Sequence, residues 1–426
     1  MQIKDLHQLF IASKGITTDT RNLKEGTIFF ALKGANFNGN KFAKNALDEG
    51  CIYAVVDEEE YAEGDRIILV DSVLKTLQDL ANYHRRQFDI PVIGITGSNG
   101  KTTSKELIGA VLTQKYNALI TEGNLNNHLG VPFTLLRMSN AHEIAIIEMG
   151  ANKPGDIKEL VEIAEPDYGI ITNIGAAHIE GFGSLEGVVK TKGEMYDFIS
   201  QVEGTLFFNQ EDEVLKGILP VNTINLGYGN GADLQGELVK QTPFVTFNWK
   251  TPGYQSPDID TNLVGRYNFT NFLAAIRMGL YFGVTAGEIN KAIHEYVPSN
   301  NRSQVTKTGR NTLIVDCYNA NATSMRAALE SFVEMESNDK LAVLGDMLEL
   351  GDISQQEHQK VVDFLVDNKL NAYLVGTEMG KTEGPFKKYP TWSALTEGEA
   401  LSTFEGKLIL LKGSRGIKLE ELIPRL

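Results

Sequence analysis

The stretch at residues 91–112, PVIGITGSNGKTTSKELIGAVL, decides the fold of this chain. Residues typical of a buried strand are followed by a loop with two glycines, and then by a lysine, two threonines and an apolar periodicity that predicts a helix. A strand, loop and helix in this order present backbone N–H groups and the positive end of the helix dipole to phosphate oxygens. The strict phosphate-loop pattern has a glycine where this sequence has Ile95, so the loop is a variant of that motif.

The residues of this loop have predicted tasks in binding ATP. Gly97 and Gly100 permit a tight turn. Lys101 can reach the β- and γ-phosphates, and the Thr102 hydroxyl can hold Mg²⁺. The expected ATP-binding residues of the loop are Gly97, Ser98, Asn99, Gly100, Lys101, Thr102 and Thr103. The alternative is an ordinary strand-to-helix loop with a solvated lysine. Such a loop would not require the strand, the two glycines, the lysine, the two threonines and the helix in this order.

Length and composition describe a large globular protein. The 426 residues exceed what one hydrophobic core usually serves, so two or three domains are expected. An apolar fraction of 42% without a run of about 18 apolar residues predicts no membrane span. The first residues lack a secretory pattern, so we expect a cytoplasmic enzyme. A net charge of −15 without a basic block disfavours a nucleic-acid partner.

The alternation of strands and helices predicts an α/β protein with three domains. We expect a small α/β domain at residues 1–88, a central parallel-sheet ATPase domain at 89–298, and a Rossmann-like α/β domain at 299–426. Residues 205–262 are rich in Gly, Asn and Thr and are expected to form β-hairpins. Strands are predicted at residues 27–32, 53–56, 67–70, 118–121, 143–148, 168–172, 312–316, 340–344, 372–375 and 408–412, and helices at 42–49, 73–87, 157–164 and 268–282.

Further motifs resemble those of the Mur ligases, ATP-dependent amide-forming enzymes of cell-wall precursor synthesis. Their loop is written T-G-x-x-G-K-[TS], without the earlier glycine. The matching motifs are GNLNNHLGVP (123–132), IIEMGANKPGDI (146–157), TNIGAAHIEGFGS (172–184), KGE (192–194) and GRYNFTNFLAA (265–275). Those that resemble the family member adding D-alanyl-D-alanine are TDTR (18–21), FFALKG (29–34), DCYNANATSM (316–325), LGDMLELG (344–351) and LKGSRG (411–416).

The resemblance implies a ligase that joins the carboxylate of a UDP-N-acetylmuramoyl tripeptide to the amine of D-alanyl-D-alanine. ATP would first convert the carboxylate to an acyl phosphate. A monomer is expected. One alternative is a family member that adds a single amino acid, or a relative of folylpolyglutamate synthase. Another is a non-catalytic nucleotide switch, although such a switch would not need a second metal site.

The resemblance also implies a catalytic and magnesium-binding set. Glu148 ends a predicted strand at the sheet edge where ligands bind, and a carboxylate there suits Mg²⁺. The catalytic residues are expected to be Lys101, Glu148, His178 and Lys192, and the magnesium ligands Thr102, Glu148, His178 and Lys192. By resemblance, Lys192 is carbamylated and so becomes an oxygen ligand, with Glu194 close by. Without the resemblance, His178 is a packed or solvent-facing residue and Lys192 is a solvated charge.

The remaining contacts follow from the same resemblance. Asn268, which shares a helix face with Asn271, is expected near the adenine, and Arg302 and Asp316 near the nucleotide phosphate and ribose. The expected substrate-binding residues are Thr20, Arg21, Asn124, Asn126, Asn127, Tyr318, Asn319, Lys412 and Arg415. Two positions depart from the family pattern: Ala322 stands where proline is usual, and Val315 where an acidic residue often precedes Asp316. A less rigid loop on the dipeptide side is expected from Ala322.

Overall fold

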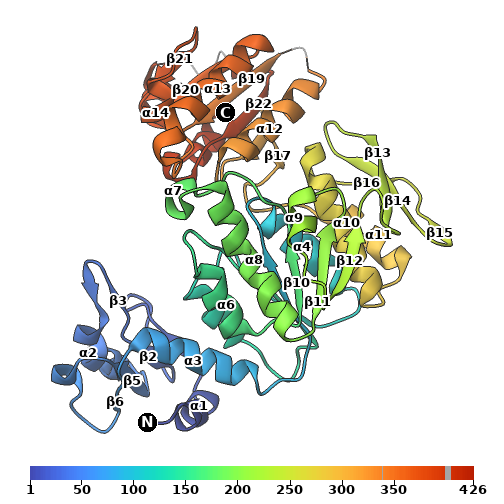
Figure 1. The fold of residues 1–426 in the computed structure, drawn as a ribbon. Coiled ribbons are helices and arrows are strands. Elements are labelled where there is room, and N and C mark those ends of the chain that lie inside the picture. The colour runs from blue at the N-terminus through green and yellow to red at the C-terminus, as the bar shows by residue number, and fades with distance from the viewer. Residues whose placement is uncertain (338, 399–403) are drawn as a thin grey trace.

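The computed structural model describes residues 1–337, 339–398 and 404–426, and it shows three α/β units in chain order (Figure 1). The first unit has a parallel sheet in the order β1-β2-β5-β6. Its strands are β1 (Ile16–Thr17), β2 (Ile28–Phe30), β5 (Tyr53–Val56) and β6 (Ile67–Leu69), with a hairpin of β3 (Lys33–Gly34) and β4 (Phe37–Asn38). Its helices are α1 (Ile3–Ala12), α2 (Ala43–Asp48) and α3 (Val73–Arg85), with 3-10 turns η1 (Gly39–Phe42) and η2 (Glu59–Tyr61).

The second unit contains a six-stranded parallel sheet in the order β12-β11-β10-β7-β9-β8. The strands are β7 (Val92–Thr96), β8 (Ala118–Ile120), β9 (Ile144–Glu148), β10 (Tyr168–Ile171), β11 (Thr205–Asn209) and β12 (Ile224–Tyr228). The helices are α4 (Lys101–Leu112), α5 (Gly130–Leu135), α6 (Asp156–Ala164), α7 (Ile179–Phe182), α8 (Leu185–Gln201), α9 (Glu213–Gly217), η3 (Arg266–Asn268), α10 (Phe269–Tyr281) and α11 (Ala286–Glu295).

Both faces of this sheet are covered by helices, because its central strands carry apolar side chains on both faces. All five residues of β7 are buried. Val92 packs in the cluster with residues of α6 and α8, whereas Ile93 and Ile95 pack in the cluster with residues of α4 and α10. This division follows the two-residue period of a strand. A continuous apolar run is what a doubly covered parallel sheet requires, as the sequence predicted.

The expectation of hairpins across residues 205–262 is wrong for the first half of that stretch. β11 and β12 pair in parallel and extend the main sheet, with α9 as their crossover. Buried Leu206 and Phe207 give β11 two covered faces, which a hairpin on the surface would not provide. Antiparallel strands begin only later, with β13 (Gln235–Lys240), β14 (Thr246–Thr251), β15 (Tyr254–Gln255) and β16 (Ile259–Asp260).

The third unit has a six-stranded sheet in the order β17-β18-β22-β19-β20-β21. Its elements are β17 (Gln304–Lys307), β18 (Thr312–Asp316), α12 (Ala322–Glu334), β19 (Lys340–Gly345), η4 (Gly351–Ile353), α13 (Ser354–Asp367), β20 (Asn371–Val375), α14 (Thr377–Gly380), β21 (Lys387–Tyr389), α15 (Trp392–Gly398), β22 (Leu408–Lys412), η6 (Arg415–Ile417) and η7 (Leu419–Arg425). The sheet is parallel as predicted, except that β17 pairs antiparallel with β18. A tight turn between them leaves no room for a crossover.

Helix α3 joins the first two units. It contacts α1 on one side and α5 and α6 on the other, and its apolar residues belong to a core that continues into the central unit. Arg85 at its end donates to the carbonyl oxygens of Ala164 and Glu165, at 3.1 Å each. No described helix is long and apolar enough to cross a membrane. The three-domain α/β class is confirmed, and the boundaries near residues 88 and 298 stay predictions.

Candidate functional site

The phosphate loop links the end of β7 to the start of α4. Gly97 has φ +147° and Gly100 has φ +78°, conformations that side chains rarely adopt. A Cβ on Gly97 would lie 1.9 Å from Thr172 Oγ1, so this position has no room for a side chain. The turn therefore depends on glycine at these two positions.

The segment after β10 holds this loop in place. Ser98 N donates to Asn173 O at 2.9 Å, and Asn99 N donates to Asn173 Oδ1 at 3.0 Å. Thr172 Oγ1 donates to Asn99 O at 2.6 Å, and Ser98 Oγ donates to Gly175 O at 3.0 Å. Both segments leave the carboxyl edge of the parallel sheet, where ligands bind in folds of this class.

Lys101 lies over the loop that it terminates. Its Nζ donates to Gly97 O at 2.7 Å and to Ser98 O at 3.3 Å. Desolvation lowers the pKa of Lys101 to about 8; the charge of Glu148 opposes this shift, and that of Arg302 adds to it. An approaching anion therefore stabilises the charged form of the Lys101 ammonium.

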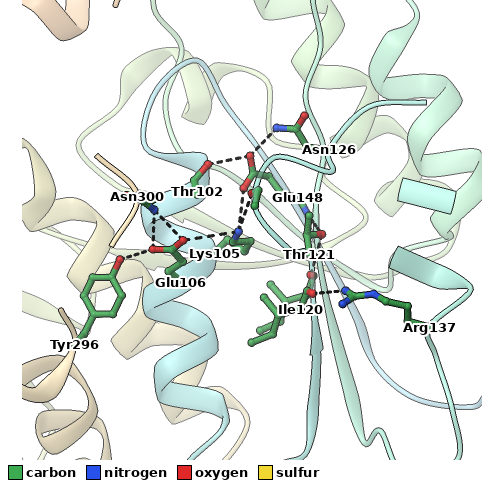
Figure 2. A network of polar contacts seen from close by, with 12 residues as sticks. Thr102, Lys105, Glu106, Ile120, Thr121, Asn126, Arg137, Glu148, Tyr296 and Asn300 are labelled. Atoms are coloured by element: carbon green, nitrogen blue, oxygen red, sulfur yellow. Dashed lines mark hydrogen bonds and ion pairs between the residues drawn. The ribbon is translucent and has the colours of Figure 1, made fainter. Parts of the chain in front are cut away.

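Glu148, the last residue of β9, is 1% exposed, and its two carboxylate oxygens have different surroundings (Figure 2). Oε1 accepts hydrogen bonds from Thr102 Oγ1 at 3.1 Å and Asn126 Nδ2 at 2.7 Å. Oε2 has no hydrogen-bond partner among the described residues, and Lys105 Nζ lies 3.8 Å from it. A buried carboxylate oxygen without a donor, beside a threonine hydroxyl, fits a hard cation such as Mg²⁺.

His178 and Lys192 lie in the neighbourhood of Lys101. His178 precedes α7 with φ +54°, and its Nδ1 contacts the carboxylate of Glu349 from the third unit. Burial lowers the pKa of His178, and Glu349 opposes that shift. Lys192 on α8 is 1% exposed, with its Nζ 5.7 Å from the Phe182 ring centre. Desolvation holds the pKa of Lys192 well below its usual value, and the charge of Lys101 adds to this effect.

Lys192 is therefore not the solvated charge that the sequence alone would favour. Glu194, by contrast, points elsewhere: its two oxygens accept from Gly155 N at 3.0 Å and Lys158 N at 2.8 Å, at the start of α6. Residues two apart on a helix face different directions, so proximity in sequence does not bring Glu194 to Lys192. No group of three His, Cys, Asp or Glu side chains suited to a metal occurs in the described part of the chain.

The third unit contributes an aromatic ring between two cations. The guanidinium carbon of Arg302 lies 3.7 Å from the Tyr318 ring centre, and that of Arg415 lies 5.5 Å from it. Arg302 Nε is buried without a hydrogen-bond partner among the described residues. Lys412 is 1% exposed and donates to Asp316 Oδ2 at 2.5 Å. The ammonium of Lys412 is thus already paired, whereas Arg415 forms no ion pair with any described residue.

Asn268 and Asn271 tie α10 to the helix that follows the loop. Asn271 Nδ2 donates to Asn268 Oδ1 at 2.9 Å, and Asn271 Oδ1 accepts from Ser104 Oγ at 3.1 Å. Asn268 Nδ2 in turn donates to Val264 O at 2.9 Å. The predicted i, i+3 relation therefore produces a direct hydrogen bond.

One cavity of about 640 Å³ brings most of the predicted residues together. From the central unit it is lined by Ser98, Asn99, Gly100, Lys101, Thr102, Thr103, Asn124, Asn126, Asn127, Glu148, His178 and Asn268, and from the third unit by Arg302, Asp316, Tyr318, Asn319, Lys412 and Arg415. Gly97 and Lys192 are outside its lining. Thr20 and Arg21 belong to the first unit, where the Arg21 guanidinium lies 2.9 Å from Asp19 and is 87% exposed in its side chain.

Several residues around the cavity were not predicted. Lys105 and Glu349 contact Glu148 and His178, and Asn321 Nδ2 donates to Asn99 Oδ1 at 2.8 Å. The helical period could have indicated Lys105, because it follows Lys101 by four residues and faces the same side of α4. Asn321 and Glu349 lie inside the motifs at 316–325 and 344–351, but no local pattern indicates their roles, because their partners in these contacts lie more than 150 residues away.

Three family profiles match the chain in order. They are described as Mur ligase family, catalytic domain, at residues 13–85; Mur ligase middle domain, at 95–279; and Mur ligase, glutamate ligase domain, at 301–415. Among curated proteins, the UDP-N-acetylmuramoyl-tripeptide–D-alanyl-D-alanine ligase of Bacillus subtilis is 35% identical, with 97% of this chain and 93% of the relative covered. The Escherichia coli protein of the same name is 33% identical, with 98% and 94% covered.

Solved structures give the same result. A crystal structure of MurF from Acinetobacter baumannii superposes with a TM-score of 0.88 at 30% identity, covering 100% of this chain and 98% of that chain. MurF ligase from Thermotoga maritima in complex with ADP superposes with a TM-score of 0.87 at 26% identity, covering 97% of each chain. A folylpolyglutamate synthase (FPGS) mutant from L. casei shares the fold at 13% identity and a TM-score of 0.65. With full-length relatives above 30% identity, this chain belongs to the Mur ligase family.

Proposed function

We propose that this chain is an ATP-dependent ligase that joins D-alanyl-D-alanine to the terminal carboxylate of a UDP-N-acetylmuramoyl tripeptide. The observation that carries the proposal is the cavity of about 640 Å³ that is lined by both the phosphate loop and the third unit. Loop, buried carboxylate and cationic side chains all face it. The full-length similarity to ligases named for this reaction supports the choice of substrates.

ATP would be held from both units. The loop residues 97–103 and Lys101 would bind its phosphates, with Asn268 near the adenine. Arg302 and Asp316 would contact the phosphate and ribose from the third unit. The 26%-identical T. maritima protein with ADP supports nucleotide binding in this fold. The free Arg302 Nε and the lowered pKa of Lys101 both favour an arriving polyanion.

Magnesium fits the residues present. Thr102 and Glu148 would hold one ion, and His178 with a carbamylated Lys192 a second. Bound Mg²⁺ offsets the charge repulsion between the phosphates and the substrate carboxylate. Few protein ligands are needed, because Mg²⁺ keeps several waters and binds substrate phosphates.

The carbamate proposal rests on the surroundings of Lys192. CO₂ reacts with the neutral amine: an N–C bond forms, one C=O electron pair moves onto oxygen and one proton leaves the nitrogen, so the neutral amine becomes an anionic carbamate. The pKa of Lys192 is lowered by desolvation, so the neutral amine is more abundant than for a solvated lysine. Its side-chain nitrogen forms no hydrogen bond or ion pair with any described residue, so no partner has to be displaced.

The reaction itself would proceed in two displacements. An oxygen of the tripeptide carboxylate attacks the γ-phosphorus, and ADP leaves, which gives an acyl phosphate. The dipeptide amine then attacks the acyl carbon, and phosphate leaves as the amide forms. Lys101 would stabilise the negative charge that develops on the transferred phosphoryl group, because its Nζ lies over the phosphate loop. Contact between the two units would exclude water that hydrolyses the intermediate.

Substrate contacts are assigned to both ends of the molecule. Thr20 and Arg21 would bind the uridine diphosphate, and Asn124, Asn126 and Asn127 the sugar or peptide. For the dipeptide carboxylate we favour Arg415, because the Lys412 ammonium is bound to Asp316. Tyr318 and Asn319 line the same cavity as Arg415. A cytoplasmic location and a monomeric state stay predictions.

Phosphate release tests the proposal. It should require ATP, UDP-N-acetylmuramoyl tripeptide and D-alanyl-D-alanine together, and product should form faster with the dipeptide than with D-alanine. Faster reaction with any single amino acid would make this chain a different Mur ligase. Phosphate release from ATP alone, without the tripeptide or the dipeptide, would contradict a ligase and favour a nucleotide switch.

A further inference from the structure

A carboxylate on the second turn of α4 holds the segment that leads into the third unit (Figure 2). Glu106 Oε2 accepts from Tyr296 Oη at 2.5 Å, and Asn300 Nδ2 donates to both oxygens of Glu106 at 2.9 Å. Tyr296 and Asn300 belong to the irregular chain between α11 and β17. Two donors from this linker thus converge on one side chain of the central unit.

The anchored linker carries Arg302 into the cavity two residues later. Asn301, directly before Arg302, has φ +57°, and Ser303, directly after it, has φ +49°. Positive φ is uncommon for residues other than glycine, so the backbone on both sides of Arg302 has an uncommon conformation. Such backbone persists only where the surroundings hold it. The bonds from Glu106 to Asn300 provide a fixed point immediately before this turn.

Lys105 connects the same anchor to the phosphate side of the cavity. Its ammonium is 2% exposed and lies between two carboxylates, 3.8 Å from Glu148 Oε2 and 4.0 Å from Glu106 Oε1. It also donates to Gly123 O at 3.2 Å. Two adjacent residues of α4 therefore contact different parts of the molecule: Lys105 contacts Glu148, and Glu106 contacts the linker to the third unit.

We propose that Glu106 is a positioning residue that acts through the linker to place Arg302 against the bound nucleotide. This inference rests on the proposed function, because it takes Arg302 as a nucleotide contact. Glu106 does not line the cavity, so its effect on a ligand must pass through the residues it holds. Charge-assisted bonds are about twice as strong as neutral ones, which suits a fixed point between two units.

The test measures ADP binding by calorimetry in the full chain, with no turnover required. Glu106→Gln keeps the shape of the side chain but loses its charge and places an amide where acceptors are needed. ADP affinity should fall about tenfold, which corresponds to one or two lost charge-assisted bonds. Tyr296→Phe removes a single bond and should weaken ADP by about threefold in the same direction. This milder variant serves if Glu106→Gln folds poorly.

A double variant separates positioning from general stability. If Glu106 acts through Arg302, Glu106→Gln combined with Arg302→Ala should bind ADP no more weakly than Arg302→Ala alone. The matched control is Glu288→Gln, which removes a half-buried carboxylate from the capping box at the start of α11. This control should alter thermal stability without changing ADP affinity.

Each outcome has one meaning. Wild-type ADP affinity in both Glu106→Gln and Tyr296→Phe, or effects that multiply in the double variant, would overturn the positioning role. A normal ADP affinity in Arg302→Ala would instead overturn the nucleotide contact assigned under the proposed function. A strong effect of Arg302→Ala beside an inert Glu106→Gln would remove this inference and leave the proposed function standing.

Discussion

At the scale of single residues, Lys101 is the cation on which the proposed reaction depends. Lys101→Met should lower turnover at least about 100-fold, because it removes charge stabilisation that grows as the phosphoryl group transfers. Its thermal stability should not fall, since desolvation already lowers the pKa of this lysine. Exposed Lys158 on α6 provides the control, as Lys158→Met should keep its rate. Near-normal turnover of purified Lys101→Met would refute the loop assignment.

The pH dependence of ADP binding offers a second measurement on Lys101. Free Lys101 has a pKa of about 8, and a bound polyanion favours its charged form. ADP affinity should therefore fall as pH rises above about 8, because binding must then restore a proton. Titrations between pH 7.5 and 9.5 should show this slope in the wild type (about tenfold per pH unit at most). The slope should be absent from Lys101→Met.

Lys192 permits a chemical-rescue experiment. Lys192→Ala should lose activity while remaining folded, and formate should restore part of the rate because it supplies carboxylate oxygens in the vacated space. Lys192→Arg should be as inactive as Lys192→Ala, because guanidinium keeps its charge. Exposed Lys190 lies on the same helix, so Lys190→Ala should behave as wild type. An active Lys192→Arg, or loss of activity without any rescue, would argue against the carbamate.

At the scale of elements, α3 joins the first unit to the second through a buried histidine pair. His84 Nε2 lies 2.9 Å from Met138 O, and His7 Nε2 lies 3.0 Å from His84 Nδ1. A carbonyl only accepts, so His84 donates through Nε2 and accepts through Nδ1, which makes it neutral. His7 is then the donor of the second bond. Protonation of His84 would break this chain of bonds.

Stability should therefore fall in mild acid. Burial lowers the pKa of both His7 and His84, so the unfolded chain binds more protons below about pH 6.5, the ordinary histidine value. The two histidines should therefore lower the melting temperature from pH 7 to pH 5. His7→Gln keeps a donor but removes one titrating group, so its decrease should be smaller. His294→Gln, at an exposed position, should leave the decrease unchanged.

At the scale of the whole molecule, the second and third units meet through few polar contacts. Asn321 Nδ2 donates to Asn99 Oδ1 at 2.8 Å, while Asn321 Oδ1 accepts from Ser324 N at 2.9 Å and caps α12. His178 and Glu349 form another contact, near α7 and η4, and Tyr267 Oη lies 2.8 Å from Ser303 Oγ. The loop that binds phosphate is thus bonded directly to the helix cap of the third unit.

Asn321→Asp separates the two tasks of this side chain. Aspartate caps a helix as well as asparagine but cannot donate to Asn99, so α12 should stay stable while the bond between units is lost. ADP affinity should fall several-fold (about 1 kcal/mol for one neutral hydrogen bond) with little change in melting temperature. Asn321→Ala should lose both, with a further loss of stability of about 1 kcal/mol. Unchanged ADP affinity in Asn321→Asp would show that the bond does not matter for binding.

Local sequence patterns were enough to predict the phosphate loop, the strands around it and the family. Gly97 and Gly100 are required by the turn itself, and the apolar run of β7 requires a sheet covered on both faces. These features depend on neighbours a few residues away. The motif that contains Glu148 could likewise be assigned to the carboxyl end of its strand, because strand ends and ligand edges coincide in parallel sheets.

Pairings over long sequence distances came only with the tertiary structure. The parallel pairing of β11 with β12, the bond of Lys412 to Asp316 and the contact of Lys105 with Glu148 all join groups whose local sequence permits other partners. A buried ammonium takes whichever carboxylate the fold brings near, and a strand pairs with whichever edge its connection can reach. Helical and strand periods give the face on which a side chain lies, whereas packing of the complete chain selects what it meets.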